Sequence, residues 1–189
     1  GQLVWLNAIY GVDLSTYDWN PAGYSTDLQA MARQIMDESL AAAVGIAGPR
    51  EIDRINIYWA TLGAMARAVR RLRLRPELVL VDARTIPGID EDQEAHVGGD
   101  GTFYQIACAS LLAKTYRDRL MHRLDQRYPG YGFSHNLGYP TPGHRKALRR
   151  LGPCWIHRRH YRGVAEWMQG DLDSLWSPEG QSEERAPGP

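Results

Sequence analysis

The sequence predicts an α/β layered domain, because two kinds of segment alternate along the chain. Segments with helical periodicity alternate with short apolar runs that have the length of buried strands. Of the 189 residues, 43% are hydrophobic, which is enough to bury one substantial core. We therefore expect a single domain over residues 1–169.

The first two helices are indicated by apolar residues at intervals of three and four. One begins near Thr26, a suitable N-cap, and runs to about Leu40, before a strand in the small-residue run 41–45. A second, longer helix follows Gly48 and Pro49, carries an apolar face from Ile52 to Leu72, and is stopped by Pro76. Both helices have the amphipathic pattern of segments that cover a sheet.

The strands of the middle region are short. Residues 77–82, Glu-Leu-Val-Leu-Val-Asp, form a continuous apolar run, which predicts a strand buried on both faces. A loop with Pro87 and Gly88 leads to a short strand over about 95–97, and glycines at 98, 99 and 101 predict a tight turn. The polar end of the first strand, Asp82, is its conspicuous residue.

The C-terminal half is predicted to be helical. One helix covers about 103–127 and ends at Pro129, residues 128–139 form an ordered loop rich in glycine and tyrosine, and a shorter helix covers about 143–151. Residues 170–189 lack periodicity and contain acidic residues, serine, glycine and proline, so we expect a disordered tail.

Charge, cysteine spacing and hydrophobicity argue against several classes of protein. Lysine and arginine total 22, as do aspartate and glutamate, so no overall basic field indicates nucleic acid, and a binding face must come from local clustering. Cys108 and Cys154 lie far apart, without the spacing of a disulfide framework or zinc site. The opening residues lack a secretory pattern and no apolar run could span a bilayer, so we expect a cytoplasmic monomer that contacts no membrane.

Two aspartates are candidates for chemistry. Asp82 closes a buried strand, and the carboxyl edge of an open α/β sheet is where sites usually lie, although a turn-forming aspartate fits the same position. Asp118 lies one helical turn beyond Lys114 and two beyond Ser110, which gives one stripe a hydroxyl, an ammonium and a carboxylate. A solvated ion pair is the plainer interpretation of that stripe.

Several segments, in order, resemble ribonuclease HII. Residues 51–62, Glu-Ile-Asp-Arg-Ile-Asn-Ile-Tyr-Trp-Ala-Thr-Leu, are similar to a helix of that family, and residues 78–82 to its aspartate-bearing strand. Gly99-Asp100 and residues 109–118, Ala-Ser-Leu-Leu-Ala-Lys-Thr-Tyr-Arg-Asp, resemble its Gly-Asp turn and a helix with a further catalytic aspartate. The likeness continues through residues 128–133, 138–144 and 157–159.

This resemblance implies a fold, an activity and site residues. The fold would be an RNase H-like mixed sheet flanked by helices, with a C-terminal helical extension that helps to hold an RNA-DNA hybrid. Asp82 and Asp118 match two of the family's four catalytic carboxylates, and Tyr139 matches the tyrosine that contacts the RNA-DNA junction. Lys114, Arg117 and Ser110 could contact the substrate, with surface ion pairing as the alternative for the two cations.

The implied cofactor is Mg²⁺ or Mn²⁺. Phosphodiester cleavage needs an in-line water, neutralised phosphate charge and a stabilised leaving oxygen, which two metal ions bridged by carboxylates can supply. Hard cations of this kind prefer oxygen ligands.

The other two family carboxylates form an Asp-Glu pair followed by Gly-Arg-Gly, and no such run occurs here. Either the chain starts downstream of that strand, or Gly11-Val-Asp13 is a degenerate form of it, with Asp13 as a metal ligand. The second alignment requires deletion of about two strands, so we favour the first. Ala83-Arg84 and Asn136-Leu137 also depart from the family, which commonly has Gly-Asn and often His-Lys there.

The resulting expectation is a metal-dependent endonuclease that cleaves the RNA strand of RNA-DNA hybrids and cuts at ribonucleotides embedded in DNA. Its activity in this chain is in question because the Asp-Glu pair is not found. The alternative is a catalytically inactive homologue that binds such hybrids.

Overall fold

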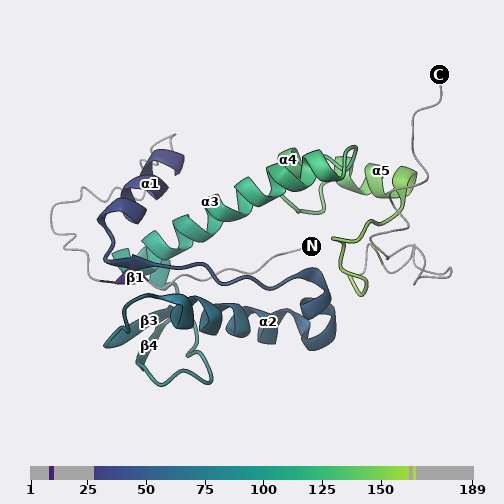
Figure 1. Cartoon of the computed structure of the whole chain (residues 1–189). Coiled ribbons are helices and arrows are strands. Elements are labelled where there is room, and N and C mark those ends of the chain that lie inside the picture. Colours follow the sequence, from purple (N-terminus) through teal and green to yellow (C-terminus); the bar gives the residue numbers. More distant parts are fainter. Residues whose placement is uncertain (1–8, 11–27, 162–163, 165–189) are drawn as a thin grey trace. The chain divides into compact units, whose positions relative to one another are not determined.

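The computed structural model describes residues 9–10, 28–161 and 164, and it has a mixed α/β architecture (Figure 1). The predicted tail and Asp13 lie outside these residues. Within them, no helix has the length and apolar character needed to cross a membrane. The elements are β1 (Ile9–Tyr10), α1 (Leu28–Glu38), β2 (Ala41–Ala42), α2 (Pro49–Arg71), β3 (Leu78–Asp82), β4 (Asp92–His96), the 3-10 turn η1 (Gly99–Gly101), α3 (Tyr104–Arg127), α4 (Phe133–Asn136) and α5 (Pro142–Leu151).

The elements separate into two units, each of which is described by itself. Of the described residues, the sheet unit comprises 9–10, 28–47 and 55–117, and the helical unit comprises 48–54, 118–161 and 164. The boundary falls inside α2 and inside α3, the two long helices. The expectation of one domain over residues 1–169 stays a prediction.

The predicted helices are confirmed, with ends that shift by a few residues. The long helix α2 differs from the prediction at Asn56, whose backbone is not helical (φ 65°, ψ 170°). The Asn56 side-chain oxygen accepts the backbone N–H groups of Tyr58 and Trp59, at 2.9 and 3.2 Å. This is the hydrogen bonding of an N-cap, so Asn56 ends one helical segment and starts the next.

The sheet unit contains two small two-stranded sheets among its described residues. β1 and β2 are antiparallel, and β3 and β4 are parallel, with Val81 opposite Ala95 and Asp82 opposite His96. Burial alternates along β3: Val79 and Val81 are buried, but Leu78 is exposed. The expectation of burial on both faces is therefore wrong for Leu78.

The core of the sheet unit forms where β3 meets α2. Its buried members come from both elements and the loop after β3: Leu62, Met65, Ala66, Val69, Val79, Val81 and Ile86. Gly45 allows a further close approach, because a Cβ there would lie 1.8 Å from the carbonyl oxygen of Ala64 in α2. Burial of this apolar surface stabilises the packing of β3, the strand that ends at Asp82, against α2.

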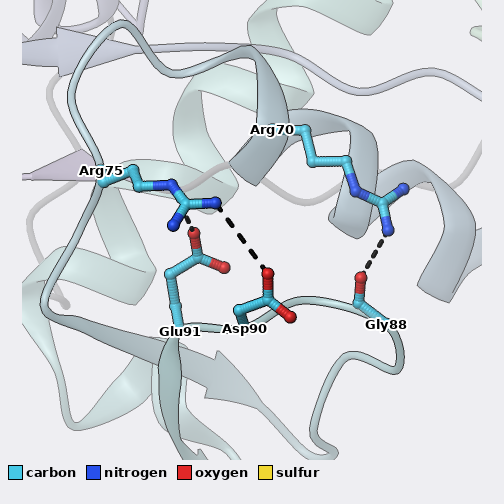
Figure 2. A network of polar contacts seen from close by, with 5 residues as sticks. All are labelled: Arg70, Arg75, Gly88, Asp90 and Glu91. Atoms are coloured by element: carbon cyan, nitrogen blue, oxygen red, sulfur yellow. Dashed lines mark hydrogen bonds and ion pairs between the residues drawn. The ribbon is translucent and has the colours of Figure 1, made fainter.

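The loop between β3 and β4 is short for a parallel pair, whose crossover usually takes a dozen residues or more. The Gln93 side chain fixes it, accepting the N–H of Ile86 at 2.6 Å and donating to the Ile86 carbonyl at 2.9 Å. Arg70 of α2 donates to the carbonyl of Gly88 at 2.5 Å, and Arg75 lies 3.9 to 4.0 Å from carboxylate oxygens of Glu91 and Asp90 (Figure 2). These contacts hold the loop in place, and residues 83–91, which the structure describes in full, form no helix between β3 and β4.

Candidate active site

Asp82 is the last residue of β3, and its carboxylate has a structural task. Its Oδ1 accepts the backbone N–H of Gly99 at 3.0 Å, which ties the end of β3 to the turn η1. The side chain is half-buried. A carboxylate has two oxygens and about four lone-pair positions, so this bond leaves acceptor capacity at the site. Turn formation and metal binding are thus compatible at Asp82.

The backbone after Asp82 turns sharply. Ala83 has φ 70°, the left-handed region that favours glycine, and its N–H donates to the His96 carbonyl at 2.9 Å. Gly99 is buried, and a Cβ there would lie 2.6 Å from Cδ1 of Ile106 in α3. The glycine therefore lets η1 pack close to α3 and holds its N–H against Asp82.

Helix α3 carries four of the predicted site residues. Ser110, Lys114 and Asp118 follow one another at four-residue intervals; the first two are exposed and Asp118 is half-buried. Arg117 is only 6% exposed. Lys114 is therefore better placed than Arg117 to meet a phosphate from solution. The substrate contacts of Ser110, Lys114 and Arg117 and the catalytic, metal-binding role of Asp118 stay predictions.

Tyr139 lies on a tight turn of the helical unit and is 48% exposed. The turn follows α4 through two left-handed residues, Leu137 (φ 49°) and Gly138 (φ 79°). It ends at Thr141, whose side-chain oxygen caps α5 by accepting the N–H of His144 at 3.2 Å, with Pro142 as the first helical residue. Its exposure leaves Tyr139 available for the predicted contact with a hybrid.

Buried polar side chains lie under this turn. Asn136, His144 and His157 are 6%, 5% and 2% exposed, and the two histidine rings stack with centroids 5.3 Å apart. Burial lowers the pKa of His157 to about 3 and also lowers the pKa of His144, because the apolar surroundings disfavour the charged ring. Both histidines are thus neutral at pH 7.

Two aspartates that the sequence did not single out for the site hold the helical unit together. The Asp53 carboxylate accepts the backbone N–H of Arg159 at 2.6 Å, across 106 residues of chain, and that of His160 at 3.3 Å. Asp125 accepts the N–H of Phe133 at 2.8 Å and the hydroxyl of Ser134 at 2.5 Å. Only the Ile52-Asp53 pair of the family resemblance pointed to either of them.

Carboxylate oxygens suit Mg²⁺ or Mn²⁺, but the described residues do not form a complete metal site. No group of three or more histidine, cysteine, aspartate or glutamate side chains that could hold an ion occurs among them. Asp82 belongs to the sheet unit and Asp118 to the helical unit. The third proposed ligand, Asp13, lies outside the described residues, so the ligand set stays a prediction.

The profile of the family "Ribonuclease HII" matches residues 23–164, a range that includes Asp82, Asp118 and Tyr139 but not Asp13. The chain belongs to the ribonuclease HII family. It is 49% identical over 138 residues to ribonuclease HII of Myxococcus xanthus, covering 73% of this chain and 47% of the relative. Its identity to ribonuclease HII of Shewanella amazonensis is 46% over 142 residues, covering 75% and 69%.

A third ribonuclease HII, from Anaeromyxobacter sp., is 44% identical over 176 residues, which cover 87% of this chain and 56% of the relative. The chain thus spans about half to two-thirds of the length of these relatives. The crystal structure of ribonuclease H2 from Pyrococcus horikoshii aligns with a TM-score of 0.64 at 18% identity, covering 87% of this chain and 96% of that one. This likeness confirms the mixed α/β fold.

Proposed function

We propose that this ribonuclease HII family member is a metal-dependent endonuclease. It cleaves the RNA strand of RNA-DNA hybrids and cuts DNA at embedded ribonucleotides. The observation that carries the proposal is the family match over residues 23–164, within which Asp82 ends a buried strand and Asp118 lies on α3. The finer fold that goes with it is an RNase H-like mixed sheet flanked by helices, with the helical unit as its C-terminal extension.

The charge distribution supports a nucleic-acid substrate, although the whole chain is neutral. The described residues of the helical unit contain eleven arginines and lysines against four aspartates and glutamates, a formal net charge of +7. In the sheet unit the described residues carry nine of each. Helix α5 contributes four exposed cations and has no acidic residue: Arg145, Lys146, Arg149 and Arg150. Such a local cluster attracts a phosphate backbone.

Four of the predicted site residues then have a specific role. Asp82 and Asp118 would hold Mg²⁺ or Mn²⁺ through carboxylate oxygens, and a bound ion would neutralise phosphate charge and assist the attacking water. Lys114 places an exposed ammonium one helical turn before Asp118, where it can pair with a phosphate. The exposed Tyr139 ring would stack on the nucleotide at the RNA-DNA junction.

A second candidate is a catalytically inactive protein that binds RNA-DNA hybrids. It is favoured by one observation: the described residues gather no group of three metal-binding side chains. It predicts salt-sensitive binding without cleavage.

Cleavage of a duplex with one embedded ribonucleotide, in Mg²⁺ and in Mn²⁺, separates these candidates. We expect the full chain to cut at the ribonucleotide, and Asp82→Asn and Asp118→Asn each to lower the rate at least a hundredfold, because metal ligands are lost. Asparagine at position 82 can still accept the Gly99 N–H, so the turn should survive.

Asp92→Asn is the matched control for Asp82, because Asp92 is an exposed aspartate on the neighbouring strand β4. This variant should cut at the wild-type rate. Salt-sensitive binding with no cutting in either metal would favour the inactive homologue. Cutting by Asp82→Asn or Asp118→Asn at the wild-type rate would remove that residue from the site.

A further inference from the structure

Two hydrogen bonds tie the turn that presents Tyr139 to Asn136, and a third ties Asn136 to Tyr131. The Asn136 Oδ1 accepts the N–H of Gly138 at 2.8 Å, and the Asn136 carbonyl accepts the N–H of Tyr139 at 2.8 Å. The Asn136 Nδ2 donates to the carbonyl of Tyr131 at 2.9 Å. The oxygen of the side-chain amide thus holds the turn, and its nitrogen anchors Asn136 to the loop before α4.

One arrangement of protons satisfies the neighbouring histidines. His157 Nδ1 lies 3.0 Å from the Cys154 N–H and 3.2 Å from the Cys154 carbonyl. Because the backbone N–H can only donate, we assign the proton of the neutral His157 ring to Nε2, 3.3 Å from His144 Nε2. His144 Nε2 must therefore accept, and its proton is on Nδ1, which donates to the Tyr131 carbonyl at 3.1 Å. Asn136 Nδ2 and His144 Nδ1, 3.2 Å apart, share that carbonyl as acceptor.

This arrangement fixes the amide of Asn136. Its nitrogen must face the Tyr131 carbonyl and its oxygen the Gly138 N–H, because the reverse orientation would oppose two donors and two acceptors. Position 136 therefore requires one donor and one acceptor. A neutral imidazole also has one of each, so histidine is the replacement that keeps both kinds of group at this position.

We propose that Asn136 is a positioning residue for recognition of the RNA-DNA junction, holding the turn that presents Tyr139. The proposal rests on the proposed function, in which Tyr139 contacts the hybrid. Asn136 is buried, and its side chain acts through the amide of Gly138, while its backbone carbonyl holds the amide of Tyr139. His144, which is paired with His157, donates to the same Tyr131 carbonyl as Asn136 Nδ2. The shared acceptor fixes which end of the Asn136 amide faces Tyr131.

The test measures binding of the full chain to a duplex with one embedded ribonucleotide, in Ca²⁺, which takes oxygen ligands in a looser geometry than Mg²⁺. Tyr139→Ala should weaken binding about tenfold or more through loss of stacking. Asn136→Asp keeps the acceptor but loses the donor, and Asn136→Leu loses both, so both should weaken binding similarly. Asn136→His should bind like the wild type.

A double-variant cycle separates positioning from general loosening. In the Tyr139→Ala background, Asn136→Asp should cause no further loss, because the ring that Asn136 positions is already gone. Ala147→Gly is the matched control: Ala147 is buried in α5 of the same unit, so this variant should lower the melting temperature without weakening binding. An all-DNA duplex should bind all variants alike.

The outcomes distinguish this inference from the proposed function. No binding by the wild type would overturn both. Wild-type binding that Tyr139→Ala leaves unchanged would remove the role of Tyr139, and the positioning role with it. Weakening by Tyr139→Ala but not by Asn136→Asp, failure of Asn136→His to bind, or a further loss in the double variant would overturn the positioning role alone.

Discussion

The two units of this chain are stabilised in different ways. In the sheet unit, apolar side chains of α2 and β3 pack together, and Gly45 brings one backbone against another. In the helical unit, buried polar groups add a hydrogen-bonded chain near the Tyr139 turn, formed by His144, His157, Asn136 and Cys154. The stability of the sheet unit should therefore depend on how closely its groups fit together, and that of the helical unit on the protonation of its buried histidines.

The difference matches what each unit has to present. Asp82 needs a strand end held at a fixed place, which apolar packing and a single bond to Gly99 provide. Tyr139 is on a turn with two left-handed residues, whose amides need specific partners. Apolar packing has no direction, whereas hydrogen bonds do, so the polar network is better suited to fixing a turn.

The largest expected effect tests shape dependence in the sheet unit. Gly45→Ala would put a Cβ 1.8 Å from the backbone oxygen of Ala64, which cannot move aside as a flexible side chain can. We expect the free energy of unfolding to fall by about 3 kcal/mol or more, measured by urea denaturation.

Gly101→Ala in the same unit is the control, because a Cβ there would meet nothing within 4 Å. Its effect should stay within about 0.5 kcal/mol. Equal effects of the two substitutions would contradict the close approach of residue 45 to α2.

The second-largest expected effect tests whether the stability of the helical unit depends on the protonation of its buried histidines. Burial lowers the pKa of His157 to about 3, so below pH 6.5 the unfolded chain binds a proton that the folded chain does not. Stability is therefore lost as pH falls from about 6.5 toward 3, by about 2 kcal/mol for His157 at pH 5. The lowered pKa of His144 acts in the same direction.

Hydrogen exchange, corrected for intrinsic rates, locates this loss. Protection of α5 amides should fall between pH 7 and pH 5 more than protection of β3 amides. His157→Asn should reduce this pH dependence, whereas His122→Asn, which changes an exposed histidine of α3, should keep it. Equal pH dependence in α5 and β3 would contradict a difference between the units.

The sequence predicted what local patterns determine. Periodicity located α1, α2, α3 and α5, and the apolar run ending at Asp82 located β3. The kink at Asn56 was missed because the apolar spacing continues through it, while the capping bonds depend on one side chain and an unusual φ. Val97 was expected in a strand, but it lies beyond β4 and is 91% exposed.

The site was predictable only in part for the same reason. Asp82, Asp118 and Tyr139 were proposed from local patterns and motifs, which are runs of neighbouring residues, and their roles stay predictions. The Asp53 bond to Arg159 joins residues 106 apart, and the pairing of His144 with His157 depends on how a loop folds over α5. Contacts of this kind follow from tertiary packing, for which a single sequence has no periodic signal.

The smallest effect tests the turn directly after Asp82. Ala83 has φ 70°, where a Cβ costs an ordinary residue about 1 kcal/mol and glycine nothing. Ala83→Gly should therefore raise the free energy of unfolding, by up to about 1 kcal/mol because the added freedom of the unfolded chain offsets part of the gain.

Ala95→Gly, on the neighbouring strand β4, is the control and should lower the free energy of unfolding by a similar amount. Opposite signs would show that the residue after Asp82 is strained while Ala95, which lies opposite Val81, is not. A loss in both variants would mean that the left-handed turn does not form, and with it the bond that holds Asp82 against Gly99 would be in question.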